Sequence, residues 1–172
     1  SKILLYNYAM MGGTPREVLE RLNDTICKKN DDSMFVTVWF GIYTISTGII
    51  TAANAGHAYP IIKRGENGFE ILKDRHGFVI GGMSGLKYRD YEFKMESGDV
   101  LFLYTDGVTE ATNLNEELYG EERLQKVLDI YKDATPETIC AEVKIDVDKF
   151  VGEAPQFDDI TMLAIRYKGT EN

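Results

Sequence analysis

The sequence predicts an α+β fold in which helices pack on antiparallel β-sheet. Helical patterns lie before and after a middle part that is filled by short β-branched and aromatic segments, so helices and strands segregate rather than alternate. Turn residues join neighbouring strand segments at intervals that suit hairpins. The 172 residues have the length of one domain, and a hydrophobic content of 44% is enough to bury one core.

The first predicted helix begins at Thr14-Pro15-Arg16-Glu17. There a capping residue precedes a proline suited to the first helical position and a glutamate that completes a capping box. Residues 30–33 (Asn-Asp-Asp-Ser) end the helix after about Lys29. Its apolar face recurs at near-helical spacing and consists of Val18, Leu19, Leu22 and Ile26.

The middle of the chain predicts a series of strands. From Met34 to Ile45 the residues are β-branched or aromatic and apolar on both faces, which predicts a central strand covered on both sides. A turn at Ser46-Thr47-Gly48 leads into a second strand, Ile49 to Ala55, and the two form a hairpin. Later strands are predicted at Pro60 to Lys63, Phe69 to Leu72, Tyr88 to Met95 and Val100 to Tyr104.

Two helices and a last strand follow. The first helix is marked by apolar residues from Leu124 to Tyr131, and Thr135 with Pro136 should begin the second. The apolar face of the second helix consists of Ile139, Val143, Val147 and Phe150. A final strand is predicted from Ile160 to Tyr167, followed by a short tail.

The charge balance argues against some classes of partner. Nineteen basic and 28 acidic residues give a net charge of −9, which repels both nucleic acid and anionic membrane surfaces. No apolar run is long enough for a membrane span or a signal peptide. Cys27 and Cys140 match no metal-binding or redox spacing, so we expect a cytoplasmic protein with reduced thiols.

Two acidic motifs lie at predicted strand ends. Asp106 follows the strand that ends at Tyr104 and precedes Gly107, which allows the backbone to turn sharply. Such an aspartate suits a bound cation, and it equally suits a loop residue that caps the next segment. Asp158 and Asp159 precede the last strand, where adjacent carboxylates repel unless they are solvated, hydrogen bonded or neutralised by a metal.

An apolar strand that ends in Asp-Gly occurs in two families of phosphatases. Haloacid-dehalogenase-like phosphatases carry Asp-x-Asp-Gly there, because the first aspartate is the nucleophile that takes the phosphoryl group. In this sequence Tyr104 stands at the position of the nucleophile, and a tyrosine cannot replace that carboxylate. This family is therefore the less favoured alternative.

A second family is matched by several segments in the same order and spacing, from near Ser1 to about Tyr167. They closely resemble the metal-dependent (PPM-type, PP2C-like) serine/threonine phosphatases called sporulation stage II protein E and the regulator-of-sigma-B phosphatases. The matching segments are Met34 to Thr37, Asn54 to Pro60, Leu101 to Ala111 with Tyr119-Gly120 and Arg123-Leu124, and Phe157 to Leu163.

The resemblance implies two antiparallel sheets sandwiched between helices and a pair of Mn²⁺ or Mg²⁺ ions with oxygen ligands. Hydroxide bridging the ions would attack phosphoserine or phosphothreonine in line, on a phosphorylated regulatory protein such as an anti-sigma-factor antagonist. Asp106 and Asp158 match two metal ligands of the family and are the candidate catalytic residues. Asp159 and Glu110 are candidates for supporting those ligands or for holding a third ion.

His57 is a further candidate, as a general acid for the leaving serine oxygen, because histidine titrates near neutrality. In the resembling family the Asn-Ala-Gly-His loop looks mainly structural. A single loop histidine also more often only forms hydrogen bonds, so a structural role is favoured.

The resemblance also implies that residues 1–172 are a partial domain. The family's domain begins upstream with Gly-Gly-Asp and Gly-Asp-Val-Ser-Gly-Lys-Gly stretches that supply further metal ligands, and residues 1–10 align with the later part of its first helix. We therefore expect weak metal binding and little activity from this chain alone, with an inactive interaction module as the alternative. A bare sheet edge would pair with a second copy, as a homodimer, or be covered by residues 1–10.

Overall fold

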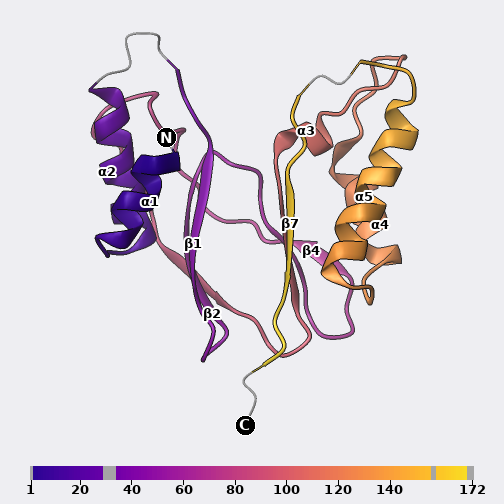
Figure 1. Ribbon diagram of the computed structural model, residues 1–172, viewed down its shortest axis with the longest axis horizontal. Helices are drawn as coiled ribbons and strands as arrows, with labels where there is room; N and C mark the ends of the chain where they lie inside the picture. The colour runs from indigo at the N-terminus through magenta and orange to yellow at the C-terminus, as the bar shows by residue number, and fades with distance from the viewer. Residues whose placement is uncertain (1, 29–33, 156–157, 170–172) are drawn as a thin grey trace. The chain divides into compact units, whose positions relative to one another are not determined.

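The computed structural model describes residues 2–28, 34–155 and 158–169, which form two compact units (Figure 1). The first unit consists of described residues within 1–57 and 74–94, and the second of those within 58–73 and 95–171. Each unit combines one antiparallel sheet with helices, which confirms the predicted α+β class. None of the described helices is both long enough and apolar enough to span a bilayer.

The first unit carries two helices and a three-stranded sheet of order β1-β2-β5, in which both pairings are antiparallel. The β1–β2 hairpin turns at residues 45–48, as the sequence predicts. The elements are α1 (Lys2–Met10), α2 (Pro15–Cys27), β1 (Val38–Thr44), β2 (Ile49–Ala55) and β5 (Tyr91–Lys94).

The core of the first unit lies between α2 and the sheet. Leu19 and Leu22 of α2 are buried in one cluster with Ala53 and Ala55 of β2. Leu4, Leu5 and Tyr8 of α1 pack partly buried against the same cluster. Residues 2–10 are thus helical, as the resemblance implies, and they pack beside α2.

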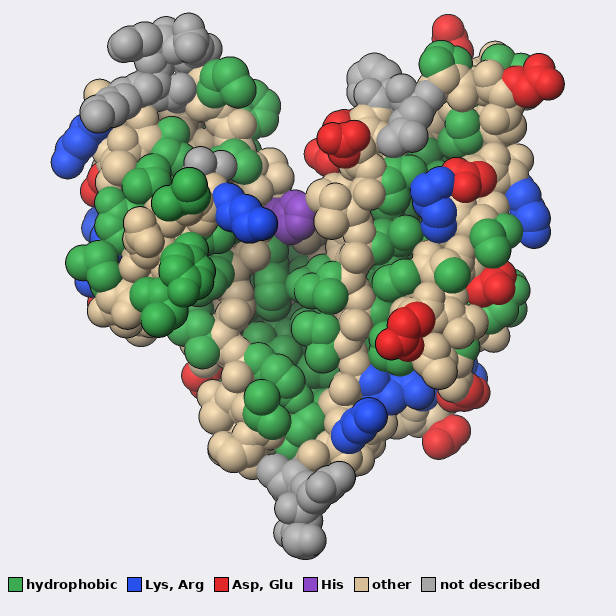
Figure 2. Space-filling view, in the orientation of Figure 1, with side chains coloured by type: hydrophobic (Ala, Val, Ile, Leu, Met, Phe, Trp, Pro, Cys, Tyr) green, Lys and Arg blue, Asp and Glu red, His purple; other side chains and the backbone are tan. Residues whose placement is uncertain are grey.

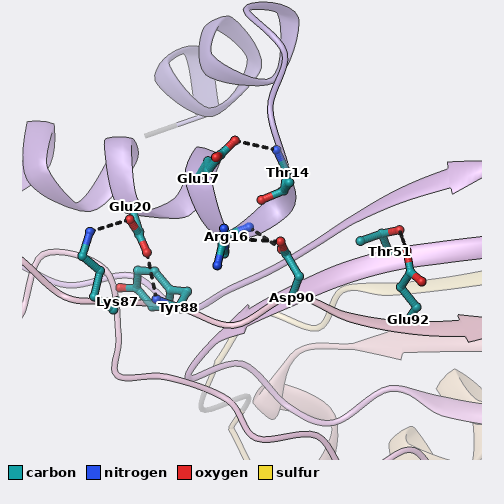
Figure 3. Close-up of polar contacts among 9 residues, drawn as sticks. All are labelled: Thr14, Arg16, Glu17, Glu20, Thr51, Lys87, Tyr88, Asp90 and Glu92. Atoms are coloured by element: carbon teal, nitrogen blue, oxygen red, sulfur yellow. Dashed lines mark hydrogen bonds and ion pairs between the residues drawn. The ribbon is translucent and has the colours of Figure 1, made fainter.

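Polar contacts fasten α2 to the segment that precedes β5 (Figure 3). The carboxylate of Glu17 accepts the N–H of the N-cap residue at 3.0 Å, which is the predicted capping-box contact. Lys87 Nζ donates to Glu20 at 2.8 Å, and the N–H of Arg16 donates to Asp90 at 2.7 Å. These last two contacts join residues 67 and 74 positions apart, so they hold α2 in place through tertiary structure.

The second unit carries a four-stranded antiparallel sheet of order β4-β3-β6-β7. Helix α4 packs on β4 and α5 on β7, so both long helices lie on one side of this sheet (Figure 1). The elements are β3 (Ile61–Lys63), β4 (Phe69–Ile71), β6 (Val100–Tyr104), α3 (Asp106–Thr109), α4 (Gly120–Ile130), α5 (Pro136–Val151) and β7 (Met162–Arg166).

The core of the second unit follows from two periodicities. Alternate residues of β6, Val100, Phe102 and Tyr104, belong to one buried cluster, because side chains on a strand alternate between its faces. Helices α4 and α5 contribute residues spaced three or four apart to the same cluster. These are Leu124, Val127, Leu128, Ile139, Val143 and Val147.

The prediction of a central strand over Met34 to Ile45 is wrong. Strand β1 begins at Val38 and lies at the edge of the three-stranded sheet formed by the described residues. Before it, Val36 forms only an isolated bridge with Ile80. The apolar pattern misled because folded proteins leave much apolar surface exposed, and Ile42 on the strand itself is 42% exposed.

Candidate active site

The candidate site lies at one end of the β6–β7 pair. The strands are antiparallel, with Tyr104 opposite Met162, so the end of β6 adjoins the start of β7. Beyond them the N–H of Thr105 donates to the carbonyl of Thr161, and the N–H of Thr161 donates to Thr105 Oγ1, both at 3.0 Å. The Thr105 hydroxyl donates to the carbonyl of Asp159 at 3.1 Å. Hydrogen bonds therefore join the two segments that carry the predicted site residues.

Gly107 brings the same two segments into van der Waals contact. A Cβ atom at this position would lie 2.4 Å from the carbonyl oxygen of Asp159 and 3.6 Å from the carbonyl carbon of Asp158. Gly107 lies inside α3 and is not among the glycines with positive φ, so the predicted role in a sharp turn is wrong. Glycine is required here because two backbones approach each other closely.

All four predicted carboxylates lie on the two joined segments and are exposed. Figure 2 shows acidic side chains, in red, on the surface of the second unit. Asp106 is the first residue of α3, and the N–H of Glu110, just after the helix, donates to the Asp106 carbonyl at 2.8 Å. Asp158 Oδ1 accepts the N–H of Asp159 at 2.6 Å. Asp106 and Asp158 thus lie on adjoining segments at the ends of neighbouring strands. Their roles as metal ligands stay a prediction.

The carboxylates of Asp106 and Asp158 suit part of the ligand set of a hard cation. Carboxylate oxygens are the ligands that Mn²⁺ and Mg²⁺ favour, and both aspartates are open to solvent. Among the described residues, no group of three or more His, Cys, Asp or Glu side chains is arranged to hold an ion. A complete site would therefore need ligands beyond Asp106 and Asp158.

Tyr104 separates the two phosphatase families that the Asp-Gly motif suggested. It is 3% exposed, belongs to the core cluster of the second unit and stacks on Phe102 with ring centroids 6.0 Å apart. Burial raises the pKa of its hydroxyl to about 12. A buried, neutral phenol does not serve as the phosphoryl-accepting nucleophile, so the haloacid-dehalogenase alternative lacks its central residue.

Replacing Tyr104 with Phe is expected to change the free energy of unfolding by less than about 1 kcal/mol, because removing an unpaired buried polar group costs little. The Tyr104 hydroxyl is buried and has no hydrogen-bond partner among the described residues. Denaturant unfolding measures the change. Tyr119→Phe is the matched control and should lose more stability, since the Tyr119 hydroxyl donates to Asp146 at 2.7 Å. Equal losses in the two variants would contradict the assignment.

The Asn54–His57 loop, in the first unit, is organised by one buried amide. Asn54 is 2% exposed, and its Oδ1 accepts the N–H of His57 at 2.8 Å. Its Nδ2 donates to the His57 carbonyl at 3.0 Å and to Asp74 at 3.1 Å, while His57 Nδ1 lies 3.4 Å from Thr37 Oγ1. These contacts support the structural role that the sequence favours for this loop.

A pocket of about 220 Å³ opens beside Asp158. Its walls come from α3 and the residues after it, from the C-terminal end of α5, and from residues 154, 155, 158 and 160. Gly107, Glu110 and Asp158 line it, whereas Asp106 does not. Sequence reasoning missed the pocket and the threonine contacts, because both arise where separate segments meet. The one available signal was a threonine beside each acidic motif, Thr105 and Thr161.

The chain is similar to known proteins over most of its length. The family model described as Stage II sporulation protein E (SpoIIE) matches residues 1–168. Protein IcfG of Synechocystis sp. is 33% identical over 144 residues, which are 83% of the chain and 22% of that protein. Phosphoserine phosphatase RsbU of Bacillus subtilis is 28% identical over 155 residues, which are 90% of the chain and 45% of that protein. The chain thus spans less than half the length of these relatives.

Solved structures show the same fold. The RsbU and RsbW domains of Rv1364c from Mycobacterium tuberculosis superpose with a TM-score of 0.81 at 22% identity, covering 98% of this chain and 46% of that one. The phosphatase domain of SpoIIE from Bacillus subtilis, presoaked with Mn, superposes with a TM-score of 0.68 at 16% identity, covering 98% and 74%. At these identities the similarity establishes the fold alone, and it matches the expected mixed architecture with two antiparallel sheets.

Proposed function

The chain belongs to the SpoIIE family, and from this premise we propose that it forms part of a metal-dependent phosphatase acting on phosphoserine or phosphothreonine. The substrate we propose is a bacterial regulatory protein, such as an anti-sigma-factor antagonist. The observation that carries the proposal is the contact between the segments of Asp106 and Asp158. The two segments are hydrogen bonded through Thr105, and their backbones pack closely at Gly107.

In this proposal Asp106 and Asp158 hold Mn²⁺ or Mg²⁺ together with further ligands. The bound ions would activate water and neutralise charge on the phosphoryl oxygens. The hydrogen bonds of Thr105 and the close packing at Gly107 hold the two carboxylates in position. Their position matters because a misplacement of about 1 Å can cost two orders of magnitude in rate. Glu110 and Asp159 are proposed to assist the ligands, as both lie on the same two segments. The similar SpoIIE domain of Bacillus subtilis was presoaked with Mn, which supports the choice of ion.

Phosphate release from a phosphoserine protein tests the proposed function. The native protein should release phosphate with Mn²⁺, stop when EDTA removes the metal, and recover when Mn²⁺ is restored in excess. The control is the same protein with phosphotyrosine in place of the phosphoserine, and it should not be hydrolysed. Release that persists in EDTA would contradict a metal-dependent mechanism.

The second candidate function is a phosphatase-like interaction module without catalysis. It is favoured by one observation, the lack of a three-ligand metal cluster among the described residues. The same assay separates the two candidates, since a module would bind its partner and release no phosphate at any Mn²⁺ concentration.

A further inference from the structure

Part of the lining of the pocket beside Asp158 is apolar. Ala111 and Val147 are 8% and 1% exposed, and the half-buried Val151 and Ile160 extend their surface. Since a cavity of about 150 Å³ accepts benzene, a volume of about 220 Å³ has room for a side chain as large as leucine or phenylalanine.

The charged residues that line the same pocket are all acidic. Glu110, Asp148 and Asp158 line it, and none of its described lining residues is a lysine or an arginine. Lys144 Nζ lies 2.6 Å from both carboxylate oxygens of Asp148, so the acidic residues of the metal-free lining outnumber the one cation beside it. Helix α5 also ends here, at Val151, and the C-terminal end of a helix carries partial negative charge. In the chain without bound metal, a cationic group at the mouth is therefore favoured over an anionic one.

The pocket adjoins the candidate active site. Asp158 belongs to both, and Gly107, the neighbour of Asp106 in the chain, lines the pocket. An extended chain advances about 3.3 Å per residue, so a phosphoserine at the proposed metal site of Asp106 and Asp158 would place residues two or three positions away over the pocket.

We propose that this pocket docks an apolar side chain that adjoins a lysine or arginine, within two or three residues of the target phosphoserine in the partner protein. The apolar side chain fills the cavity, while the cation faces the acidic lining. The proposal rests on the proposed function for the identity of the partner. The preference of the pocket for a molecule that carries both an apolar group and a positive charge can be measured without turnover and without metal.

The first experiment titrates the isotope-labelled chain with phenethylamine and follows its amide NMR signals. Phenethylamine joins a benzene ring to an ammonium group, and 3-phenylpropionate, with a similar ring and a carboxylate, is the matched probe. The amine should shift the signals of Gly107, Thr112 and Gly152 with a Kd on the order of 1 mM, as suits a ligand of this size. The carboxylate should bind at least tenfold more weakly.

Variants assign the binding to the pocket. Val151→Trp should fill the cavity and weaken amine binding at least tenfold, and Ala154→Leu should do so independently if the tryptophan disturbs the fold. Ile130→Trp is the control, because Ile130 is 72% exposed at the end of α4 and lies outside the pocket. Glu110→Gln should reduce the preference for the amine over the carboxylate.

A second experiment connects the pocket to the substrate. A phosphoserine peptide with Leu-Lys two residues away should bind the chain about tenfold more tightly than one with Leu-Glu, and Glu110→Gln should reduce this difference. Val151→Trp should weaken the binding of both peptides, because both carry the leucine. Equal binding of the two probes, or unchanged binding in both cavity-filling variants, would overturn the proposal. If the native protein releases phosphate but the pocket does not bind the amine, the docking proposal fails and the proposed function stands. If the pocket binds the amine but no phosphate is released, the proposed phosphatase function fails.

Discussion

In the native protein, replacing Asp106 with Asn is expected to lower kcat/KM for phosphoserine hydrolysis by about 100-fold or more, since changing groups that merely support metal ligands already costs roughly 10–100-fold. Asn keeps the size of the side chain and one oxygen, and it removes the negative charge that binds the ion. Asp106 is exposed at the start of α3, so its replacement should leave the fold intact. Steady-state kinetics with a phosphoserine protein and a Mn²⁺ titration measure the two effects.

Two further variants sharpen this experiment. Asp158→Asn should behave like Asp106→Asn, because the Asn Oδ1 can still accept the N–H of Asp159 and only the charge is lost. Glu122→Gln, which removes one charge from the exposed face of α4, is the control and should keep full activity. Near-normal turnover in Asp106→Asn would show that the family match assigns the wrong ligand.

Those parts of the fold that have local signals were predictable from the sequence. Thr14-Pro15 and Thr135-Pro136 mark the starts of α2 and α5, and the Thr135 hydroxyl indeed accepts the N–H of Thr138 at 3.2 Å. The turn between β1 and β2 likewise has its own signature in the sequence. Periodicity could not show that β5 pairs with β2, because Tyr91 and Ala52 meet only through the tertiary fold.

The candidate site divides in the same way. Asp106 and Asp158 stand out in the sequence because each lies beside a strand in a motif, and the pairing of β6 with β7 brings their segments together. The threonine hydrogen bonds and the pocket depend on contacts between segments about 50 residues apart. Gly107 illustrates the limit. The sequence predicts a glycine that allows a sharp turn, whereas the contact that requires glycine is with the backbone of Asp159.

Replacing Gly107 with Ala is expected to destabilise the second unit by about 1–2 kcal/mol, because overpacking costs typically 1–3 kcal/mol and the better helix propensity of alanine returns up to about 1 kcal/mol. The added Cβ would lie 2.4 Å from the backbone oxygen of Asp159, so the Asp158–Asp159 segment must move and activity should fall with it. Denaturant unfolding and Mn²⁺ affinity measure the two consequences. Gly82→Ala is the matched control, since its Cβ would meet side chains rather than backbone. These are the ring of Phe78, which is 57% exposed and can rotate away, and Val79 Cγ2 at 3.2 Å. If Gly107→Ala is as stable as the control and binds Mn²⁺ as well as wild type, the close backbone contact is not what positions Asp158.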